Sequence, residues 1–326
     1  ATIPSNYKMN RPKTHINDLR FPPHGGELPC LPGVTMRGIV DFSVSINPLG
    51  IPSRVDSLAE QLLNDLGSYP DSESTEIKQT LADLLGVNTN SITVTNGSTE
   101  LIYFLPALWK QNSSMLCVAP LFSEYERAFR LAGIPVHEWH LSPESSFSVD
   151  MPAFLRKLDS IKDLGGIIIG HPNNPTGTLW ERSSILHLLE YCEKRTVYLV
   201  VDETFIDFAG WEHSLLKQAE QFRTLILVQS LTKFYALPGL RLGYGITSPE
   251  VASTIRAFRP PWSVNSIAQK VGVAVLKDTE FKTNSRQYIG PERDYLHTGM
   301  AAIRPIHVIP SHANFLMFHR RGENVQ

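Results

Sequence analysis

The sequence predicts an α/β fold with three layers, in which a mostly parallel central sheet lies between helices, together with a smaller α+β domain. One observation is a set of five short apolar runs that are continuous rather than alternating, as in strands buried on both faces of a parallel sheet. Another is that helical patterns lie between these runs. A chain of 326 residues that is 42% apolar is also large enough to bury an extensive core.

The strands and helices can be placed individually. The five apolar runs are residues 91–95, 115–119, 166–170, 197–201 and 224–228. In residues 71–86, apolar side chains recur at helical spacing from Ile77 to Leu85, acidic residues occupy the first turn, and Gly86 follows as a stop signal. Residues 183–193 repeat this helical pattern.

The remaining segments suggest how the chain is divided. Residues 1–50 are rich in proline and glycine and are expected to form an arm and part of the small domain. Residues 51–247 carry the strand and helix alternation and are expected to form a large, cofactor-binding domain. Residues 248–326 are expected to complete the small domain, with strands at 306–310 and 314–318, and to be truncated at its end.

Composition narrows the classes of function. The net charge of −2 and the pI near 6.6 disfavour binding to nucleic acid or to anionic membranes. The three cysteines are far apart and fit no disulfide framework or metal motif, and His137 and His140 have no further ligand at metal-binding spacing, so no metal is expected. With no apolar stretch of about 20 residues and no signal-peptide pattern, the protein is expected to be cytoplasmic.

A cluster of polar or aromatic residues follows each apolar run. The clusters are residues 96–100, 120–122, 171–177, 202–205 and 230–233. Open α/β sheets bind ligands outside the carboxyl ends of their strands, so these clusters are expected to converge on one crevice.

Lys233 is the candidate nucleophile in this crevice. The Lys233 amine could condense with an aldehyde, and Ser230, Thr232 and Arg241 could hold a phosphate through charge-assisted hydrogen bonds. This combination fits the chemistry of pyridoxal 5'-phosphate. The alternative is a solvated surface lysine, which is the commoner state of lysine in proteins.

Two clusters could hold other parts of the same cofactor. Gly97, Ser98 and Thr99 begin a helix, and the free N–H groups of a helix start attract phosphate. The alternative is an ordinary N-cap. Phe122 could stack on the cofactor ring, with Tyr125 reaching a polar edge, although buried aromatic residues usually belong to the core.

Asp202 and Asn174 are the remaining candidates. Asp202 ends an apolar run, where a buried carboxylate needs a cationic partner such as a protonated pyridine nitrogen or a nearby arginine. The Asn174 amide could donate to a phenolic oxygen of the cofactor, or Asn174 could simply form a turn.

These motifs together resemble the fold type I pyridoxal phosphate enzymes of the class I/II aminotransferase family. The resemblance rests on the order of Asn-Asn-Pro-Thr-Gly at 173–177, Asp-Glu-Thr-Phe at 202–205, Ser-Leu-Thr-Lys at 230–233 and Arg241, and it covers residues 24–318. Within the family, the chain is similar to the branch of histidinol-phosphate aminotransferases and threonine-phosphate decarboxylases. The resemblance implies a homodimer in which Tyr69 reaches the cofactor phosphate of the neighbouring subunit.

Two features are similar to the decarboxylases of cobalamin biosynthesis. One is His24-Gly25-Gly26 followed by the segment 41–50, which includes Asn47, and the other is a phenylalanine at position 205 where the aminotransferases have tyrosine. The resemblance implies decarboxylation of O-phospho-L-threonine, with Lys233 as the proton donor and Asp202 on the ring nitrogen. The residues expected at the substrate are His24, Gly25, Asn47, Arg320 and Arg321.

Two alternatives remain open from the sequence. A histidinol-phosphate aminotransferase would use the same cofactor residues. The second alternative is a regulatory protein that keeps the fold but has no catalytic activity. Such a protein has no physical need for Lys233, Asp202, Asn174 and Arg241 together.

Overall fold

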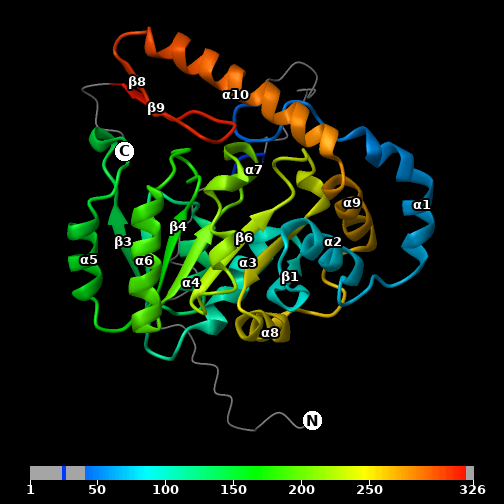
Figure 1. Ribbon diagram of the computed structural model, residues 1–326, viewed down its shortest axis with the longest axis horizontal. Helices are drawn as coiled ribbons and strands as arrows, with labels where there is room; N and C mark the ends of the chain where they lie inside the picture. Colours follow the sequence, from blue (N-terminus) through cyan, green and yellow to red (C-terminus); the bar gives the residue numbers. More distant parts are fainter. Residues whose placement is uncertain (1–23, 27–40, 321–326) are drawn as a thin grey trace, which may run out of the picture.

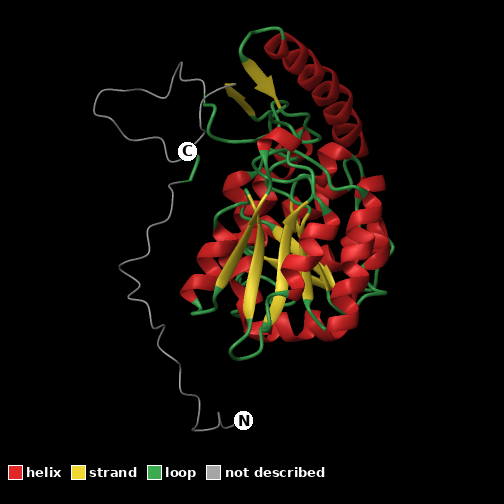
Figure 2. Ribbon diagram, turned by 90° about the vertical axis from the view of Figure 1, so that its left-hand side faces the viewer, coloured by secondary structure: helices red, strands yellow, loops and turns green. Residues whose placement is uncertain are grey.

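The computed structural model describes residues 24–26 and 41–320 and places a twisted seven-stranded sheet between two layers of helices (Figures 1 and 2). The strand order is β1-β7-β6-β5-β4-β2-β3. All neighbouring strands are parallel except at β7, which is antiparallel to both β1 and β6. The predicted fold class, a mostly parallel sheet covered by helices, is therefore confirmed.

Each of the five apolar runs forms a strand of this sheet. These strands are β1 (Ile92–Thr95), β2 (Ser114–Ala119), β4 (Leu164–Gly170), β5 (Tyr198–Asp202) and β6 (Leu225–Ser230). The sheet is completed by β3 (Val136–His140) at one edge and by β7 (Gly243–Thr247) between β1 and β6. Because β7 is antiparallel to both of its neighbours, β1 and β6 point in the same direction. All five predicted strands therefore end at the same edge of the sheet.

Helices cover both faces of the sheet and separate the core into two parts. One face packs against α2 (Thr75–Leu85), α5 (Met151–Asp159), α6 (Arg182–Arg195) and α9 (Ser266–Leu276). The other face packs against α3 (Gly97–Phe104), α4 (Glu124–Leu131) and α8 (Pro249–Phe258). The helix predicted from residues 71–86 is α2, and Gly86 ends it with φ +69°, a conformation in which glycine carries no Cβ penalty.

The chain beyond the sheet carries a long helix and a small second sheet. The remaining helices are α1 (Ala59–Asn64), α7 (Ile206–Ala209) and α10 (Thr279–Ala301). Figure 1 shows α10 running over the edge of the main sheet towards the antiparallel pair β8 (Ile306–Val308) and β9 (Phe318–Arg320).

The strand predicted at residues 314–318 is wrong in position. Residues 314–317 are irregular, and β9 starts only at Phe318. The apolar pattern of residues 314–318 reflects a side-chain contact rather than strand pairing, since the half-buried Phe315 ring packs edge-on against Phe205 with centroids 5.0 Å apart. In the part of the chain that the structure describes, no helix is long and apolar enough to cross a bilayer.

Candidate functional site

Three of the loops that follow the five parallel strands are joined to one another at the shared edge of the sheet. The backbone N–H of His171, after β4, donates to the carbonyl of Asp202 at the end of β5 at 2.8 Å. The Asn173 amide in the same loop donates to the carbonyl of Pro120, after β2, at 2.9 Å. Three of the predicted clusters are thus connected directly by hydrogen bonds.

Lys233 stands in the loop after β6, half-buried among these clusters. Burial lowers the pKa of the Lys233 amine, and the positive charge of Arg241 lowers it further. No hydrogen bond or ion pair of its ammonium group is formed within the described residues. A lysine with a lowered pKa and a free amine is suited to attack an aldehyde near neutral pH.

Arg241 lies against the start of α3. A Cβ atom added to Gly97 would lie 2.5 Å from Nη2 of Arg241, so the guanidinium occupies the space that a side chain would take. The backbone at Gly97 has φ +78°, and Gly243 of β7 approaches the Ser98 N–H so closely that its added Cβ would be 2.3 Å away. These two glycines allow Arg241 and the start of α3 to meet.

The helix start is not closed by an ordinary cap. The Asn96 side chain makes no capping hydrogen bond, and within the described residues the Ser98 and Thr99 hydroxyls make none either. The N–H groups of the first turn, these hydroxyls and Arg241 therefore form a cradle for an anion, as the predicted phosphate site requires.

Ser230 and Thr232 lie directly before Lys233 and are both buried. Their hydroxyls are 2.8 Å apart, and the Thr232 N–H donates to Ser230 Oγ at 3.3 Å. This pair is held rigidly beside the lysine. A phosphate in the cradle could accept from one hydroxyl while the other hydroxyl donates within the pair.

Asp202 is buried at the end of β5 with neutral partners only. The Tyr125 hydroxyl donates to Asp202 Oδ2 at 2.9 Å, and the Thr204 N–H donates to Oδ1 at 2.9 Å. Burial raises the pKa of Asp202, although both hydrogen bonds oppose that rise. No arginine or lysine pairs with Asp202 among the described residues, so the ion-pair alternative is not realised.

Glu203 is a buried acid that the sequence reasoning missed. The Glu203 carboxylate accepts from Ser214 Oγ, the Leu215 N–H and Gln229 Nε2 at 2.7 to 2.8 Å. Burial raises its pKa to about 7. The only signal in the sequence is its place beside Asp202, where alternation along the strand turns its side chain to the opposite face.

The two asparagines after β4 differ in their surroundings. Asn173 is buried and holds its turn together, since its amide also donates to Thr176 Oγ1 at 3.0 Å. Asn174 is half-buried, and its side chain has no hydrogen-bond partner within the described residues. Of the two, Asn174 is therefore the one whose amide remains available in the described residues, and its role at a ligand stays a prediction.

Phe122 is half-buried and lies between His24 and Tyr125. Its ring centroid is 5.6 Å from that of His24 and 6.5 Å from that of Tyr125. His24 Nε2 is 2.7 Å from Glu124 Oε1, and a Cβ added to Gly25 would overlap the carbonyl of Ser43. The structure thus brings His24 and Gly25 next to the residue expected to stack on the cofactor.

The other predicted substrate residues are placed differently. Asn47 is buried and its side chain is bonded entirely within the protein, as described below. Arg320 lies in β9, in register with Ile306 of the small sheet. Arg321 lies outside the described residues. These residues stay predictions, and the polar atoms of the Asn47 side chain are already occupied.

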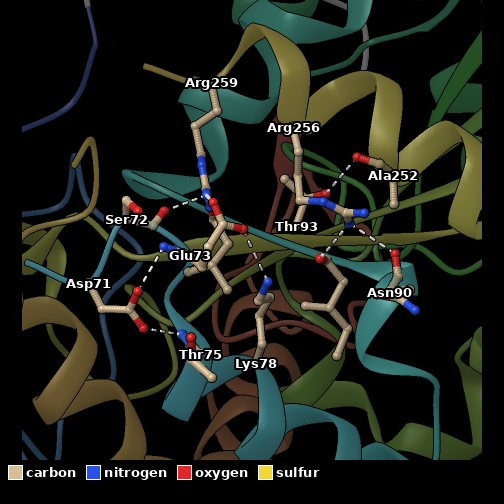
Figure 3. A network of polar contacts seen from close by, with 12 residues as sticks. Asp71, Ser72, Glu73, Thr75, Lys78, Asn90, Thr93, Ala252, Arg256 and Arg259 are labelled. Atoms are coloured by element: carbon tan, nitrogen blue, oxygen red, sulfur yellow. Dashed lines mark hydrogen bonds and ion pairs between the residues drawn. The ribbon is translucent and has the colours of Figure 1, made fainter. Parts of the chain in front are cut away.

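Tyr69 lies on the surface, apart from the other cofactor residues. It is 81% exposed, and its ring packs on that of Trp262 with centroids 4.7 Å apart. The following residues are anchored firmly, because the Arg259 guanidinium donates to the Ser72 carbonyl at 2.5 Å and to the Val94 carbonyl of β1 at 3.2 Å (Figure 3). An exposed aromatic side chain on an anchored segment is suited to contact another subunit.

The residues present fit a phosphorylated aromatic aldehyde. The cradle beside Gly97 suits its phosphate, the Lys233 amine suits its aldehyde, and the unpaired buried carboxylate of Asp202 suits a protonated ring nitrogen. Phe122 is connected to Asp202 through Tyr125, while contacts of Asn174 and Phe122 with a phenolic oxygen and a ring face stay predictions.

Comparison with known proteins relates the chain to a large family. Residues 37–324 match the family described as "Aminotransferase class I and II". The chain is 32% identical over 306 residues to the threonine-phosphate decarboxylase of Salmonella typhimurium, a match that covers 93% of this chain and 83% of that protein.

Two further matches differ in their described activities. The chain is 35% identical over 303 residues to the adenosylcobalamin biosynthesis bifunctional protein CobDQ of Leptospira interrogans. This match covers 92% of this chain but only 34% of the length of that protein. The crystal structure of the histidinol-phosphate aminotransferase from Clostridium acetobutylicum superimposes with a TM-score of 0.81 at 30% identity, covering 88% of this chain and 84% of that one.

Proposed function

Because this chain belongs to the class I and II aminotransferase family, we propose that it is a pyridoxal 5'-phosphate enzyme that decarboxylates O-phospho-L-threonine. The product would be (R)-1-amino-2-propanol O-2-phosphate, and the reaction would belong to cobalamin biosynthesis. Family membership supports the cofactor predicted from Lys233, Arg241 and Asp202. The observation that carries the proposal is that Asp202 ends one strand and Lys233 follows the neighbouring strand at the same edge of the sheet, where Arg241 lies against the start of α3 and lowers the pKa of Lys233.

Each of the chain's own residues has a distinct task in this reaction. The cofactor, when bound, accepts the electron pair of the bond that breaks at the substrate Cα. Lys233 would supply the amine that holds the aldehyde, and its amine would then be the group that donates a proton to the substrate Cα. Asp202 would face the ring nitrogen and favour its protonated form, and Tyr125 and Thr204 keep the Asp202 carboxylate in place.

The phosphate and the ring face would be held by the other predicted residues. Gly97, Ser98, Thr99 and Arg241 would bind the phosphate, with Ser230 and Thr232 beside them. Phe122 would stack on the ring, and Asn174 would donate to its phenolic oxygen. Tyr69 would reach the phosphate of a neighbouring subunit in a homodimer.

Two observations favour decarboxylation among the reactions of the family. His24 lies beside Phe122, where a substrate attached to the cofactor would extend. Phe205 is buried against Phe315 and has no hydroxyl to offer the cofactor, unlike the tyrosine of the aminotransferases. The named decarboxylase relative matches nearly the whole chain.

A histidinol-phosphate aminotransferase is the second candidate. The structural similarity to the clostridial enzyme supports it, because the cofactor residues would be the same for both reactions. A noncatalytic regulatory protein is disfavoured, since the free amine of Lys233, the unpaired carboxylate of Asp202 and the open cradle at Gly97 serve no purpose in the fold itself.

The decisive assay compares two reactions of the purified, cofactor-loaded protein. We expect carbon dioxide release from O-phospho-L-threonine and no glutamate from histidinol phosphate plus 2-oxoglutarate. Lys233→Ala is expected to lower the rate by a factor on the order of 10² to 10⁴, because the proton donor to Cα is removed.

The opposite outcomes decide between the candidates. Glutamate formation without carbon dioxide release would replace the decarboxylase with the aminotransferase. If the protein attaches the cofactor to none of its lysines and catalyses neither reaction, the noncatalytic alternative is favoured.

A further inference from the structure

Asn47 is bonded to the loop that carries Lys233 through both its backbone and its side chain. The Asn47 backbone N–H donates to the carbonyl of Lys233 at 3.1 Å, and its side-chain Nδ2 donates to the carbonyl of Phe234 at 2.7 Å. The same Nδ2 donates to Ser285 Oγ of α10 at 2.8 Å, while Oδ1 accepts from the Leu49 N–H at 3.0 Å. Both amide protons and the amide oxygen of Asn47 are therefore in use.

Burial makes these hydrogen bonds obligatory. Asn47 is 2% exposed and Ser285 is fully buried, so water cannot replace a bond that is lost. A substrate anion at Asn47 would have to displace one of its three side-chain bonds and leave a buried group without a partner. The role of Asn47 is therefore different from the substrate contact expected from the sequence.

The long helix α10 is tied to the same loop by the residue after Ser285. Arg286 Nε donates to the carbonyl of Asp207 in α7 at 2.9 Å, and its guanidinium lies 6.0 Å from the centroid of the Phe234 ring. Asn47 and Arg286 thus connect α10 to the lysine loop from two sides.

We propose that Asn47 is a positioning residue for Lys233, which holds the carbonyl of Lys233 through its backbone and the carbonyl of Phe234 through its side chain and so directs the lysine side chain into the site. This inference rests on the proposed function, since it assigns Asn47 a task in attaching the cofactor to Lys233. Two consecutive carbonyls held by one buried asparagine leave the backbone at Lys233 little freedom to turn. The amine then reaches the aldehyde without a search through other orientations.

The test measures attachment of pyridoxal 5'-phosphate to the cofactor-free protein by its absorbance, as a rate at a series of pH values. Asn47→Ala is expected to slow attachment at pH 7 about tenfold and to move the pH dependence of the rate upwards, since a loosened loop exposes the amine and returns its pKa towards the ordinary value. Should Asn47→Ala fail to fold, Asn47→Ser, whose hydroxyl can still donate one hydrogen bond, is expected to show the same changes to a smaller degree.

Two control variants separate positioning from general destabilisation. Ser285→Ala removes the bond to α10 but leaves the bond to Phe234, and should change the attachment rate less than about twofold. Asp150→Ala removes the N-cap of α5, where Asp150 Oδ1 accepts from the Ala153 N–H at 3.1 Å, and should lower the melting temperature without altering the rate.

The outcomes distinguish this inference from the proposed function. If wild-type protein does not attach the cofactor to Lys233, as borohydride reduction and peptide mass analysis would reveal, the proposed function fails. If wild-type protein attaches it and the Asn47 variants attach it at the same rate with the same pH dependence, Asn47 does not position Lys233 and only the inference is overturned.

Discussion

Asp202 is a buried carboxylate whose partners in the described part of the chain are all neutral. An ionised carboxylate in such a place is costly unless a cation joins it. The Tyr125 hydroxyl and the Thr204 N–H stabilise the charged form and hold down a pKa that burial raises. The ionisation state of Asp202 near neutral pH therefore depends on these two donors.

Removal of the Tyr125 hydroxyl should shift the acid side of the pH profile. Tyr125→Phe deletes the 2.9 Å hydrogen bond to Asp202 Oδ2, so the Asp202 pKa should rise further. A hydrogen bond to a charged group contributes about 1.5 to 3 kcal/mol, so the acid limb of kcat/KM is expected to move up by about one to two pH units. The measurement is kcat/KM for carbon dioxide release from pH 5 to 9.

Tyr191→Phe is the matched control for this experiment. The Tyr191 hydroxyl donates to Asp159 at the surface, also at 2.9 Å, and its loss should leave the acid limb unchanged. An unchanged acid limb in Tyr125→Phe would mean that Asp202 does not control activity on the acid side.

At the scale of elements, the site depends on how the start of α3 meets the loop before β7. Gly97 has φ +78° and no room for a Cβ atom, because the Arg241 guanidinium occupies that space. Glycine is required here for two separate reasons, backbone conformation and close approach.

Gly97→Ala should therefore affect both stability and cofactor binding, and Gly86→Ala should affect stability alone. Gly86 at the end of α2 has a similar φ of +69° but nothing within 4 Å of an added Cβ. Each substitution is expected to lower the free energy of unfolding by about 1 kcal/mol. Displacement of Arg241 by Gly97→Ala should in addition weaken cofactor binding at least about tenfold, as measured by titration. Equal cofactor affinity in the two variants would contradict a phosphate site at α3.

The elements also show where sequence patterns were sufficient. Four of the five strands were predictable because each is a nearly continuous apolar run, and β1 because Ile92 and Val94 alternate with threonine, while parallel order follows from the helices between the strands. β7 was not predicted, since Gly243 and Gly245 interrupt its apolar pattern. The strand at 314–318 was misplaced because burial of Phe315 against Phe205 is a tertiary contact that local apolar pattern cannot distinguish from strand pairing.

At the scale of the whole molecule, Tyr69 and Trp262 leave an aromatic pair on the surface, 81% and 49% exposed. The segment that follows Tyr69 is anchored, because the carbonyl of Ser72 accepts a hydrogen bond from Arg259 (Figure 3). Exposed aromatic side chains on a rigid support are typical of interfaces. The homodimer and the division at residues 50 and 247 nevertheless stay predictions.

A mixing experiment tests whether Tyr69 completes the neighbouring site. Tyr69→Ala and Lys233→Ala chains are co-expressed and assayed at a cofactor concentration that leaves the Tyr69→Ala sites mostly empty. In a homodimer that shares Tyr69, each mixed dimer has one native site, so random mixing should restore about a quarter of the native activity.

The control combines two substitutions, each of which damages the site of the chain that carries it. Lys233→Ala mixed with Asp202→Asn should restore nothing, because every mixed dimer then has two damaged sites. A Tyr69→Ala and Lys233→Ala mixture no more active than its separate components would show that Tyr69 does not serve the partner.

The sequence by itself determined five strands of the main sheet, the order of the polar clusters and the residue types that suit a phosphorylated aldehyde, because burial period and turn chemistry are local properties of the chain. Tertiary structure decided which groups remain available for a ligand. It left the Lys233 amine and the Asn174 amide without partners in the described residues and gave Asp202 only neutral ones, while it used all of Asn47 within the protein. Availability depends on every neighbour that packs around a side chain, and those neighbours come from distant parts of the sequence.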